Sequence, residues 1–322
     1  MDRREVLLAT GAVLLAGSAP SSAAEPPAPP ALPVPDAWEE AERMALWPGG
    51  APDVAQFDAG AVPAGWPASY RRAVREPELR VFRPARANGR AVVLIPGGAY
   101  WFVSFVNEGV DVARRLNEQG YTVFVLIYRL PGEGWRARAD VPLQDAQRAV
   151  RWVRSKAADY RVDPATIAVI GFSAGGHLAA TLATGHRERL APGIDAIDGL
   201  DARPHAVALI YPVITMREPG THGLSRQLLL GERPSTAAVE RRSAERHVDA
   251  TTPPLFLVHA IDDAAVPVQN SLDMLAAMRA AKRPVEAHLL QEGGHAFGVG
   301  RPDTPSAQWL ALFDAWLRRT PA

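Results

Sequence analysis

Short apolar segments alternate along this chain with longer segments of helical periodicity, and this alternation most limits the folds it can adopt. Segments that are apolar at every position, rather than at alternate positions, are typical of strands covered on both faces. The sequence therefore predicts an α/β fold with a mostly parallel central sheet and helices on both faces. Strands are expected at 79–84, 91–98, 121–130, 166–173, 205–213, 254–261 and 285–291, and helices at 107–120, 142–160, 175–185, 267–281 and 304–319.

Composition excludes several classes of function. The 322 residues, 48% of them hydrophobic, are enough for a large core. The 35 basic residues balance the 35 acidic ones, so no net charge draws the protein to nucleic acid or to a membrane surface. The absence of cysteine excludes disulfides, thiolate catalysis and Cys-ligated metals. Asp195, Asp198 and Asp201 recur every third residue, whereas calcium loops use alternate positions, so a solvated loop is favoured over a metal site.

Residues 1–24 have the features of an export signal, with a charged start, a short apolar stretch and a small-residue end. The pair Arg3-Arg4 ahead of the apolar stretch is similar to the twin-arginine type of signal. A membrane anchor is the alternative, but it needs about 20 apolar residues and this stretch is shorter. The proline-dense residues 25–35 are expected to form an extended linker, and 36–322 a single domain. A periplasmic or secreted location is predicted.

The stretch GFSAG places Ser173 between Gly171 and Gly175, with an apolar strand pattern before it and an alanine-rich helical pattern after it. In this context G-x-S-x-G forms a tight strand-to-helix turn that exposes a nucleophilic serine. The two glycines let the backbone pack closely around the turn. A plain glycine turn capped by a serine is the alternative, and the flanking elements favour the nucleophile.

A serine hydroxyl needs a neighbouring base, and the base needs a third group that orients it. His295 is the candidate base, because it lies on a glycine-flanked loop just after the last expected strand. His259, within a strand pattern, and His177, on the helix behind the serine, are assigned packing roles. The acid is expected after the penultimate strand, where Asp262 and Asp263 are adjacent, and spacing does not choose between them. Simple turn residues are the alternative for both.

An anion pocket for the reacting carbonyl is expected where the strand at 91–98 runs into Gly97-Gly98, because glycine backbone N–H groups can approach a ligand closely. Ala174, the residue after the nucleophile, is expected to donate a second N–H group. A turn without a catalytic role is the alternative. This chemistry requires neither a metal nor an organic cofactor.

Several segments match the motifs of one superfamily, namely LWPGGAP, IPGGAYWFVSFVNEG, YRLP, PLQDAQRAVRWVR, IAVIGFSAGGHLAA, LIYPVI, PPLFLVHAIDDAAVPVQNS, GGHAFG and WLALFDAWL. Through them the sequence resembles the α/β-hydrolase superfamily, and within it the secreted acetylxylan-esterase-like branch related to hormone-sensitive-lipase-type esterases. The resemblance covers residues 45–318. The family pattern H-x-x-x-D-x-x-V-P falls on His259 and Asp263, so the resemblance favours Asp263 as the acid.

The chain departs from the family pattern at two positions. Ala296 stands where a glycine usually follows the catalytic histidine, and Ala99 stands where lipase-like relatives often have a third glycine. Both alanines are expected to narrow or reshape the substrate pocket without removing the mechanism.

The resemblance implies an α/β-hydrolase fold and ester hydrolysis by acyl transfer, with Ser173 attacking, His295 as base and Asp263 orienting the imidazole. Gly98 and Ala174 would receive the oxyanion. The implied substrate is an acetyl or other short acyl ester, on xylan or on another plant-derived polysaccharide or oligosaccharide. Residues that stack on a sugar are expected among Tyr100, Trp101 and Trp135, with burial in the core as the alternative.

Two other functions remain open on the sequence. Prolyl-oligopeptidase-type peptidases share the serine motif, but they carry a propeller domain for which this chain has no room. The second possible function is that of a non-catalytic binding protein with the same fold. The presence of serine, acid and histidine in the chain order of the superfamily favours an enzyme. The segments 187–204 and 214–250 lie between the expected elements, and we expect them to shape the substrate site.

Overall fold

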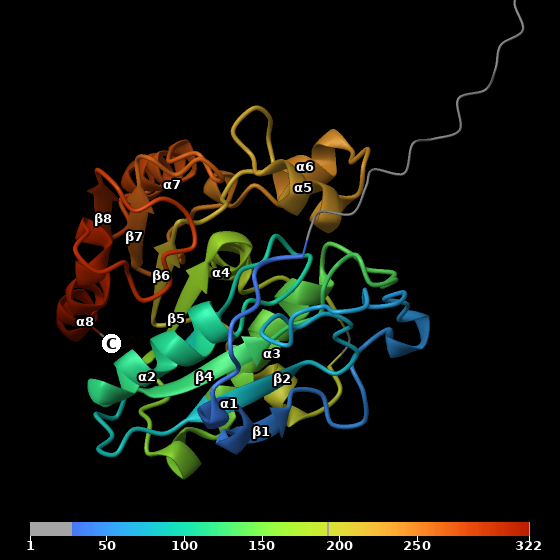
Figure 1. The fold of residues 1–322 in the computed structure, drawn as a ribbon, viewed down its shortest axis with the longest axis horizontal. Helices are drawn as coiled ribbons and strands as arrows, with labels where there is room; N and C mark the ends of the chain where they lie inside the picture. The colour runs from blue at the N-terminus through green and yellow to red at the C-terminus, as the bar shows by residue number, and fades with distance from the viewer. Residues whose placement is uncertain (1–27, 192, 322) are drawn as a thin grey trace, which may run out of the picture.

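The structure, a computed structural model, describes residues 28–191 and 193–321. Its centre is an eight-stranded sheet in the order β1-β2-β4-β3-β5-β6-β7-β8 (Figure 1). β2 is antiparallel to both β1 and β4, and all other neighbouring strands are parallel. The strands are β1 (Glu42–Ala45), β2 (Glu78–Phe82), β3 (Ala91–Ile95), β4 (Thr122–Ile127), β5 (Ile167–Phe172), β6 (Ala206–Ile210), β7 (Leu255–Ala260) and β8 (Val285–Leu290).

Helices cover both faces of this sheet. The helices are α1 (Asp36–Glu40), α2 (Asp111–Glu118), α3 (Val141–Ser155), α4 (Ser173–Gly185), α5 (Gly223–Leu230), α6 (Thr236–Arg241), α7 (Gln269–Ala280) and α8 (Trp309–Arg319). Shorter helical turns are η1 (Val54–Gln56), η2 (Val106–Val110), η3 (Ala157–Tyr160), η4 (Ala196–Gly199), η5 (Ala244–Arg246) and η6 (Pro305–Gln308). α3 packs beside α4, which contacts β5 and β6, whereas α2 packs against β4 and α8 against β7.

The central strands form the hydrophobic core. Every residue of β3, β4, β5, β6 and β7 is buried, whereas β8 at the edge of the sheet is only partly buried. Strands that are apolar at every position can be buried in this way only if both faces are covered. The predicted mostly parallel sheet with helices on both faces is therefore confirmed.

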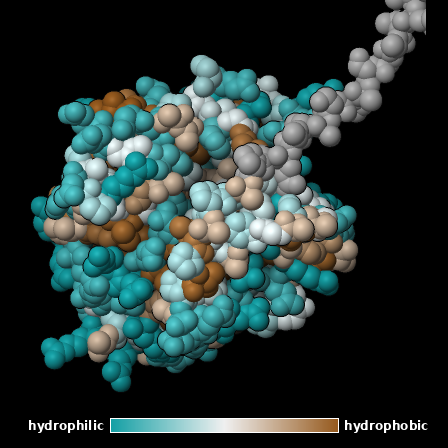
Figure 2. Space-filling view, in the orientation of Figure 1, coloured by the Kyte–Doolittle hydropathy of each residue, from teal (hydrophilic) through white to brown (hydrophobic). Residues whose placement is uncertain are grey.

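The face of the molecule drawn in Figure 2 is mainly hydrophilic, with apolar residues in separate small patches. Single exposed apolar side chains are normal on soluble proteins and need no partner to explain them. The large apolar side chains that are most exposed are Leu32, Val62, Ile194, Ile261, Leu289 and Leu312.

Some element boundaries differ from those expected. β3 ends at Ile95 rather than at residue 98, because Pro96 has no N–H group for the sheet and the chain then turns away. α4 starts at Ser173, two residues earlier than expected, so the nucleophile candidate is itself the first residue of the helix. The sequence did not predict the short elements β1 and α1, nor α5 and α6 within the segment 214–250.

The predicted export signal at 1–24 lies outside the described residues. Of the predicted linker at 25–35, the described part packs on the domain, because the Leu32 N–H group donates to Ser69 Oγ (3.1 Å) and the Tyr70 hydroxyl donates to the Pro30 carbonyl (2.9 Å). Residues 28–35 form neither helix nor strand, and these two hydrogen bonds connect them to Ser69 and Tyr70, so the role of the segment as a linker stays a prediction. Among the described residues, no helix combines the length and the apolar character needed to cross a membrane.

A buried ion pair joins the end of β4 to α3. Neither Arg129 nor Asp145 has exposed side-chain surface, and the carboxylate also accepts the Trp47 Nε1–H (2.7 Å). We expect Asp145→Asn to lower the free energy of unfolding by about 3–5 kcal/mol, because it leaves the Arg129 charge buried without a counterion. Urea unfolding measures this loss as a lower midpoint at an unchanged slope.

The exposed pair of Arg115 and Glu118 is the control for this prediction, since both side chains are more than half exposed. Glu118→Ala should cost less than about 1 kcal/mol. Equal losses for the two variants would contradict the stabilising role of the buried pair.

Candidate active site

Ser173 lies in the sharp turn that joins β5 to α4. Its φ is +51°, a left-handed conformation that is costly for a residue with a side chain. A side chain at Gly171 would collide with Ala179 and the backbone of Gly175, and one at Gly175 would collide with the backbone of Ile95. The two glycines of the motif are therefore required for close packing, as the sequence indicates, and they hold the serine at the end of the strand.

The structure brings Ser173, His295 and Asp263 together in one hydrogen-bonded series. Ser173 Oγ lies 2.9 Å from His295 Nε2, and His295 Nδ1 lies 2.7 Å from Asp263 Oδ2. The other oxygen of Asp263 accepts the N–H groups of Ala265 and Val266, each at 2.9 Å. A base that is hydrogen-bonded to the hydroxyl on one side and to a carboxylate on the other is the arrangement that activates a serine.

The carboxylate of Asp263 remains ionised in this setting. Burial by itself would raise its pKa, but hydrogen bonds from His259 and His295, together with the charge of His295, outweigh burial and hold the pKa well below its usual range. Asp263 therefore acts as a hydrogen-bond acceptor toward the imidazole throughout the neutral pH range.

The two adjacent aspartates have different roles. Asp262 Oδ1 accepts the Gly294 N–H (2.8 Å), so this side chain supports the loop that carries His295 but does not touch the imidazole nitrogens. Asp263 is the one that faces the imidazole, as the family pattern favours and as spacing along the chain left open.

His259 does more than the packing role assigned to it from the sequence. It is buried in β7, and its Nε2 lies 3.0 Å from the Val266 carbonyl and 3.3 Å from Asp263 Oδ2. Its Nδ1 lies 2.8 Å from the Ser271 hydroxyl. Because both neighbours of Nε2 are acceptors, Nε2 carries the proton. His259 therefore contacts the same Asp263 oxygen that faces His295. The family pattern that contains both residues was the available signal.

The loop after β3 approaches the nucleophile. A side chain on Gly97 would lie 2.8 Å from Ser173 Cβ, so glycine is needed here for contact. In the described part of the chain, the N–H groups of Gly98 and Ala99 have no acceptor. Ala174, in the first turn of α4, has an N–H group without an intrahelical partner. These three N–H groups can donate to an oxyanion.

The prediction that Gly97 donates to the oxyanion is wrong. Its N–H group donates to Glu108 Oε2 (2.6 Å), so it is already used and is not free to receive the oxyanion as predicted. Glu108 itself is a residue that sequence reasoning missed, because a single glutamate in a helical pattern is normally a solvated residue.

The prediction that Tyr100, Trp101 and Trp135 stack on a sugar is wrong for two of the three residues. Tyr100 is buried and its hydroxyl lies 2.7 Å from His177 Nδ1. Trp135 is buried against Phe57 and the Arg129 guanidinium. Neither ring offers a free face. Trp101, edge-on against Trp66, is also buried at 9% exposure, and as the most exposed of the three rings it is the one kept as a candidate contact.

The segment 214–250 starts beside the nucleophile. The Val213 N–H group donates to the Ser173 carbonyl (3.0 Å), and α5 and α6 lie at the upper edge of the molecule in Figure 1. Burial and the nearby charge of His295 lower the pKa of His222, the residue that caps α5. The start of this segment and His222 therefore lie near the triad, and its role in shaping the substrate site stays a prediction.

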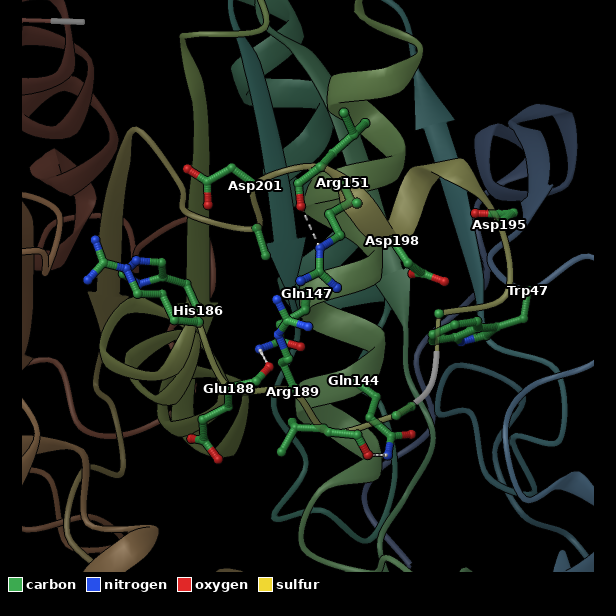
Figure 3. A pocket seen from close by; sticks show the side chains of 17 residues that line it. Trp47, Gln144, Gln147, Arg151, His186, Glu188, Arg189, Asp195, Asp198 and Asp201 are labelled. Carbon is green, nitrogen blue, oxygen red and sulfur yellow. Dashed lines mark hydrogen bonds between the residues drawn. The ribbon is translucent and has the colours of Figure 1, made fainter.

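The segment 187–204 lines a separate cavity of about 590 Å³ (Figure 3). Its walls include Trp47, Gln144 and Gln147, and none of the triad residues. Asp195 and Asp198 both pair with the buried Arg148 guanidinium. Among the described residues, no group of three or more His, Asp or Glu side chains is placed to hold a metal ion.

Comparisons with known proteins agree on the family. The model of the BD-FAE family matches residues 79–278, which is more than half of the chain. The chain belongs to the BD-FAE family. Its fold is that of the α/β hydrolases, as the resemblance in the sequence implies.

Curated relatives and a solved structure extend this family assignment. The chain is 34% identical over 249 residues to an acetylxylan esterase of Xylanibacter ruminicola, with 76% of this chain and 48% of the relative covered. It is 32% identical to the probable carboxylic ester hydrolase LipM of Mycobacterium tuberculosis, over 66% of this chain and 50% of the relative. The chain thus spans about half the length of these two relatives.

The crystal structure of the acetyl ester-xyloside bifunctional hydrolase from Caldicellulosiruptor lactoaceticus superposes with a TM-score of 0.73 at 31% identity. The superposition covers 86% of this chain and 96% of that one. The likeness therefore includes nearly the whole of that hydrolase fold.

Proposed function

We propose that this BD-FAE-family protein is a serine esterase that hydrolyses acetyl and other short acyl esters, with xylan and related plant polysaccharides or oligosaccharides as the acyl carriers. The observation that carries the proposal is the series from Ser173 through His295 to Asp263, next to N–H groups that have no acceptor among the described residues. The names of the relatives support the acetyl group and the xylan-derived carrier.

The reaction follows from this geometry. His295 Nε2 accepts the proton of Ser173 as Oγ attacks the acyl carbon, and Asp263 stabilises the imidazolium that forms. The carbonyl oxygen becomes an oxyanion that accepts hydrogen bonds from the backbone N–H groups of Gly98 and Ala174, with Ala99 as a third donor. The C–O bond then breaks, and His295 returns the proton to the departing alcohol.

The second half of the reaction repeats these steps with water. His295 takes a proton from the water molecule that attacks the acyl-enzyme, and the collapsing intermediate releases the carboxylic acid and regenerates the Ser173 hydroxyl. Each step uses side chains and N–H groups of this chain. An extracellular carrier such as xylan also agrees with the export signal predicted for residues 1–24, which mass spectrometry of the mature protein can test.

A substrate panel tests the proposal. We expect turnover to fall from 4-nitrophenyl acetate through the butyrate to the octanoate, and we expect acetate release from acetylated xylan. Prolyl 4-nitroanilides, which report peptidase activity, should not be cleaved. A fluorophosphonate probe should label the folded protein at Ser173. Absence of both labelling and ester turnover would favour a non-catalytic binding protein.

A further inference from the structure

A buried hydrogen-bonded chain connects the oxyanion loop to the loop that carries His295. Glu108 is 2% exposed, and its Oε2 accepts the Gly97 N–H at 2.6 Å. The Tyr211 hydroxyl donates to Glu108 Oε1 at 2.9 Å, and in turn accepts the Gly298 N–H at 3.1 Å. Both carboxylate oxygens of Glu108 are therefore used, and the tyrosine hydroxyl both donates and accepts.

In the oxyanion loop, Glu108 helps to fix the orientation of the peptide groups of Pro96, Gly97 and Gly98. The Pro96 carbonyl accepts the Tyr128 hydroxyl (2.9 Å), and the Gly97 carbonyl accepts the Ser104 N–H (3.0 Å). In a trans peptide the carbonyl and the following N–H group point in opposite directions. Because the Gly97 carbonyl points toward Ser104, the N–H group of Gly98 points away from it. Anchoring of the Gly97 N–H by Glu108 holds the loop in this orientation.

On the histidine side, Tyr211 supports the imidazole directly. Its ring centroid lies 4.9 Å from that of His295 and 4.5 Å from that of Phe297, in edge-on geometry with each. Tyr211 has a φ of +38°, a strained conformation for a large side chain. Such strain persists where surrounding contacts determine the conformation, and the hydroxyl bonds to Glu108 and Gly298 supply such contacts.

The element that carries Glu108 is unusual. η2, Val106–Val110, is a π-helix, in which the Val110 N–H group bonds to the Phe105 carbonyl (2.8 Å). Short π-helices are rare and are frequent at functional sites. The neighbouring Asn107 donates to the Ala296 carbonyl (3.1 Å), so the same short helix contacts the histidine loop a second time.

The charge of Glu108 is tuned by this environment. Burial raises its pKa, and the bonds from Gly97 and Tyr211 together with the charge of His295 offset burial only in part. A glutamine at this position, which is neutral and has the same shape, can therefore keep one of the two hydrogen bonds. Its amide oxygen still accepts a bond from one of the two donors.

We propose that Glu108 is a positioning residue which, through Gly97 and Tyr211, holds the oxyanion loop and the His295 loop in a fixed relation to each other. The inference rests on the proposed esterase function, because it concerns the same site. It assigns to a buried acid outside the triad the task of aligning the two halves of the catalytic apparatus.

Three variants test the proposal with 4-nitrophenyl acetate. Glu108→Ala should lower kcat by about 10²-fold or more, the loss typical of a misplaced oxyanion donor, while KM changes less than about threefold. Glu108→Gln should recover most of this loss, because its amide oxygen can still accept the Gly97 N–H. Tyr211→Phe, which keeps the ring and removes the hydroxyl, should lower kcat by about tenfold.

Glu133 provides a matched control. It is also a buried carboxylate that accepts two backbone N–H groups, those of Ala73 (2.6 Å) and Val74 (2.9 Å), but it makes no contact with the triad. Both Glu133→Ala and Glu108→Ala should lower the melting temperature, but Glu133→Ala should keep kcat within about twofold of the wild type.

The outcomes separate the possible explanations. The inference is wrong if folded Glu108→Ala keeps kcat within about threefold of the wild type, or if Glu133→Ala loses as much kcat. If Glu108→Ala does not fold, the comparison moves to Glu108→Gln and Tyr211→Phe, and wild-type kcat in both would overturn the inference. A wild-type protein that neither turns over esters nor binds the fluorophosphonate probe would instead overturn the proposed function.

Discussion

Ser173→Ala should reduce kcat/KM for 4-nitrophenyl acetate by about 10⁵-fold or more, a loss comparable to that seen when a triad serine is removed elsewhere. The hydroxyl is 2.9 Å from His295 Nε2, and alanine supplies no atom that can attack the carbonyl. The backbone keeps its place, because the turn is held by Gly171, Gly175 and the bond from Val213 to the Ser173 carbonyl. The rate is measured on protein shown to be folded by thermal unfolding.

A serine outside the site is the control. Ser155 closes α3, where its hydroxyl donates to the Trp152 carbonyl (2.7 Å), and Ser155→Ala should keep full activity and probe labelling. Ester turnover by Ser173→Ala within about tenfold of the wild type would show that another group is the nucleophile.

Asp263→Asn should lower kcat by about 10⁴-fold, the loss expected when the imidazole is held in the wrong tautomer. The substituted amide would present N–H groups to His295 Nδ1, where the wild-type protein has a carboxylate oxygen at 2.7 Å. The imidazole would then carry its proton on Nε2, where it cannot accept the proton of Ser173. Steady-state kinetics with 4-nitrophenyl acetate measure the effect.

Asp262→Asn is the neighbouring comparison. Asp262 Oδ1 accepts the Gly294 N–H, and an asparagine oxygen can accept the same bond, so we expect a loss of less than about tenfold. The reverse order of the two losses would move the orienting acid by one residue in the chain.

Local sequence patterns were enough to predict the central sheet. β4, β5, β6 and β7 are apolar at nearly every position, and such segments are stable only between two layers of helices. The edge strand β1 and the short helix α1 were not predicted, because four or five residues carry too little periodicity to separate a strand or helix from a turn. Strand order, in which β4 lies between β2 and β3, is likewise invisible to local patterns.

The sequence by itself determined the nucleophile turn and the order of serine, acid and histidine, since both can be read from short motifs along the chain. Tertiary structure alone decided that the Gly97 N–H group turns toward Glu108 and that Tyr100 and Trp135 are buried. Spacing along the chain left Asp262 and Asp263 open, the family pattern favoured Asp263, and the structure has Asp263 against the imidazole. The physical reason is that these outcomes depend on the direction of single bonds between segments that are distant in the chain, and such directions are set only when the layers pack.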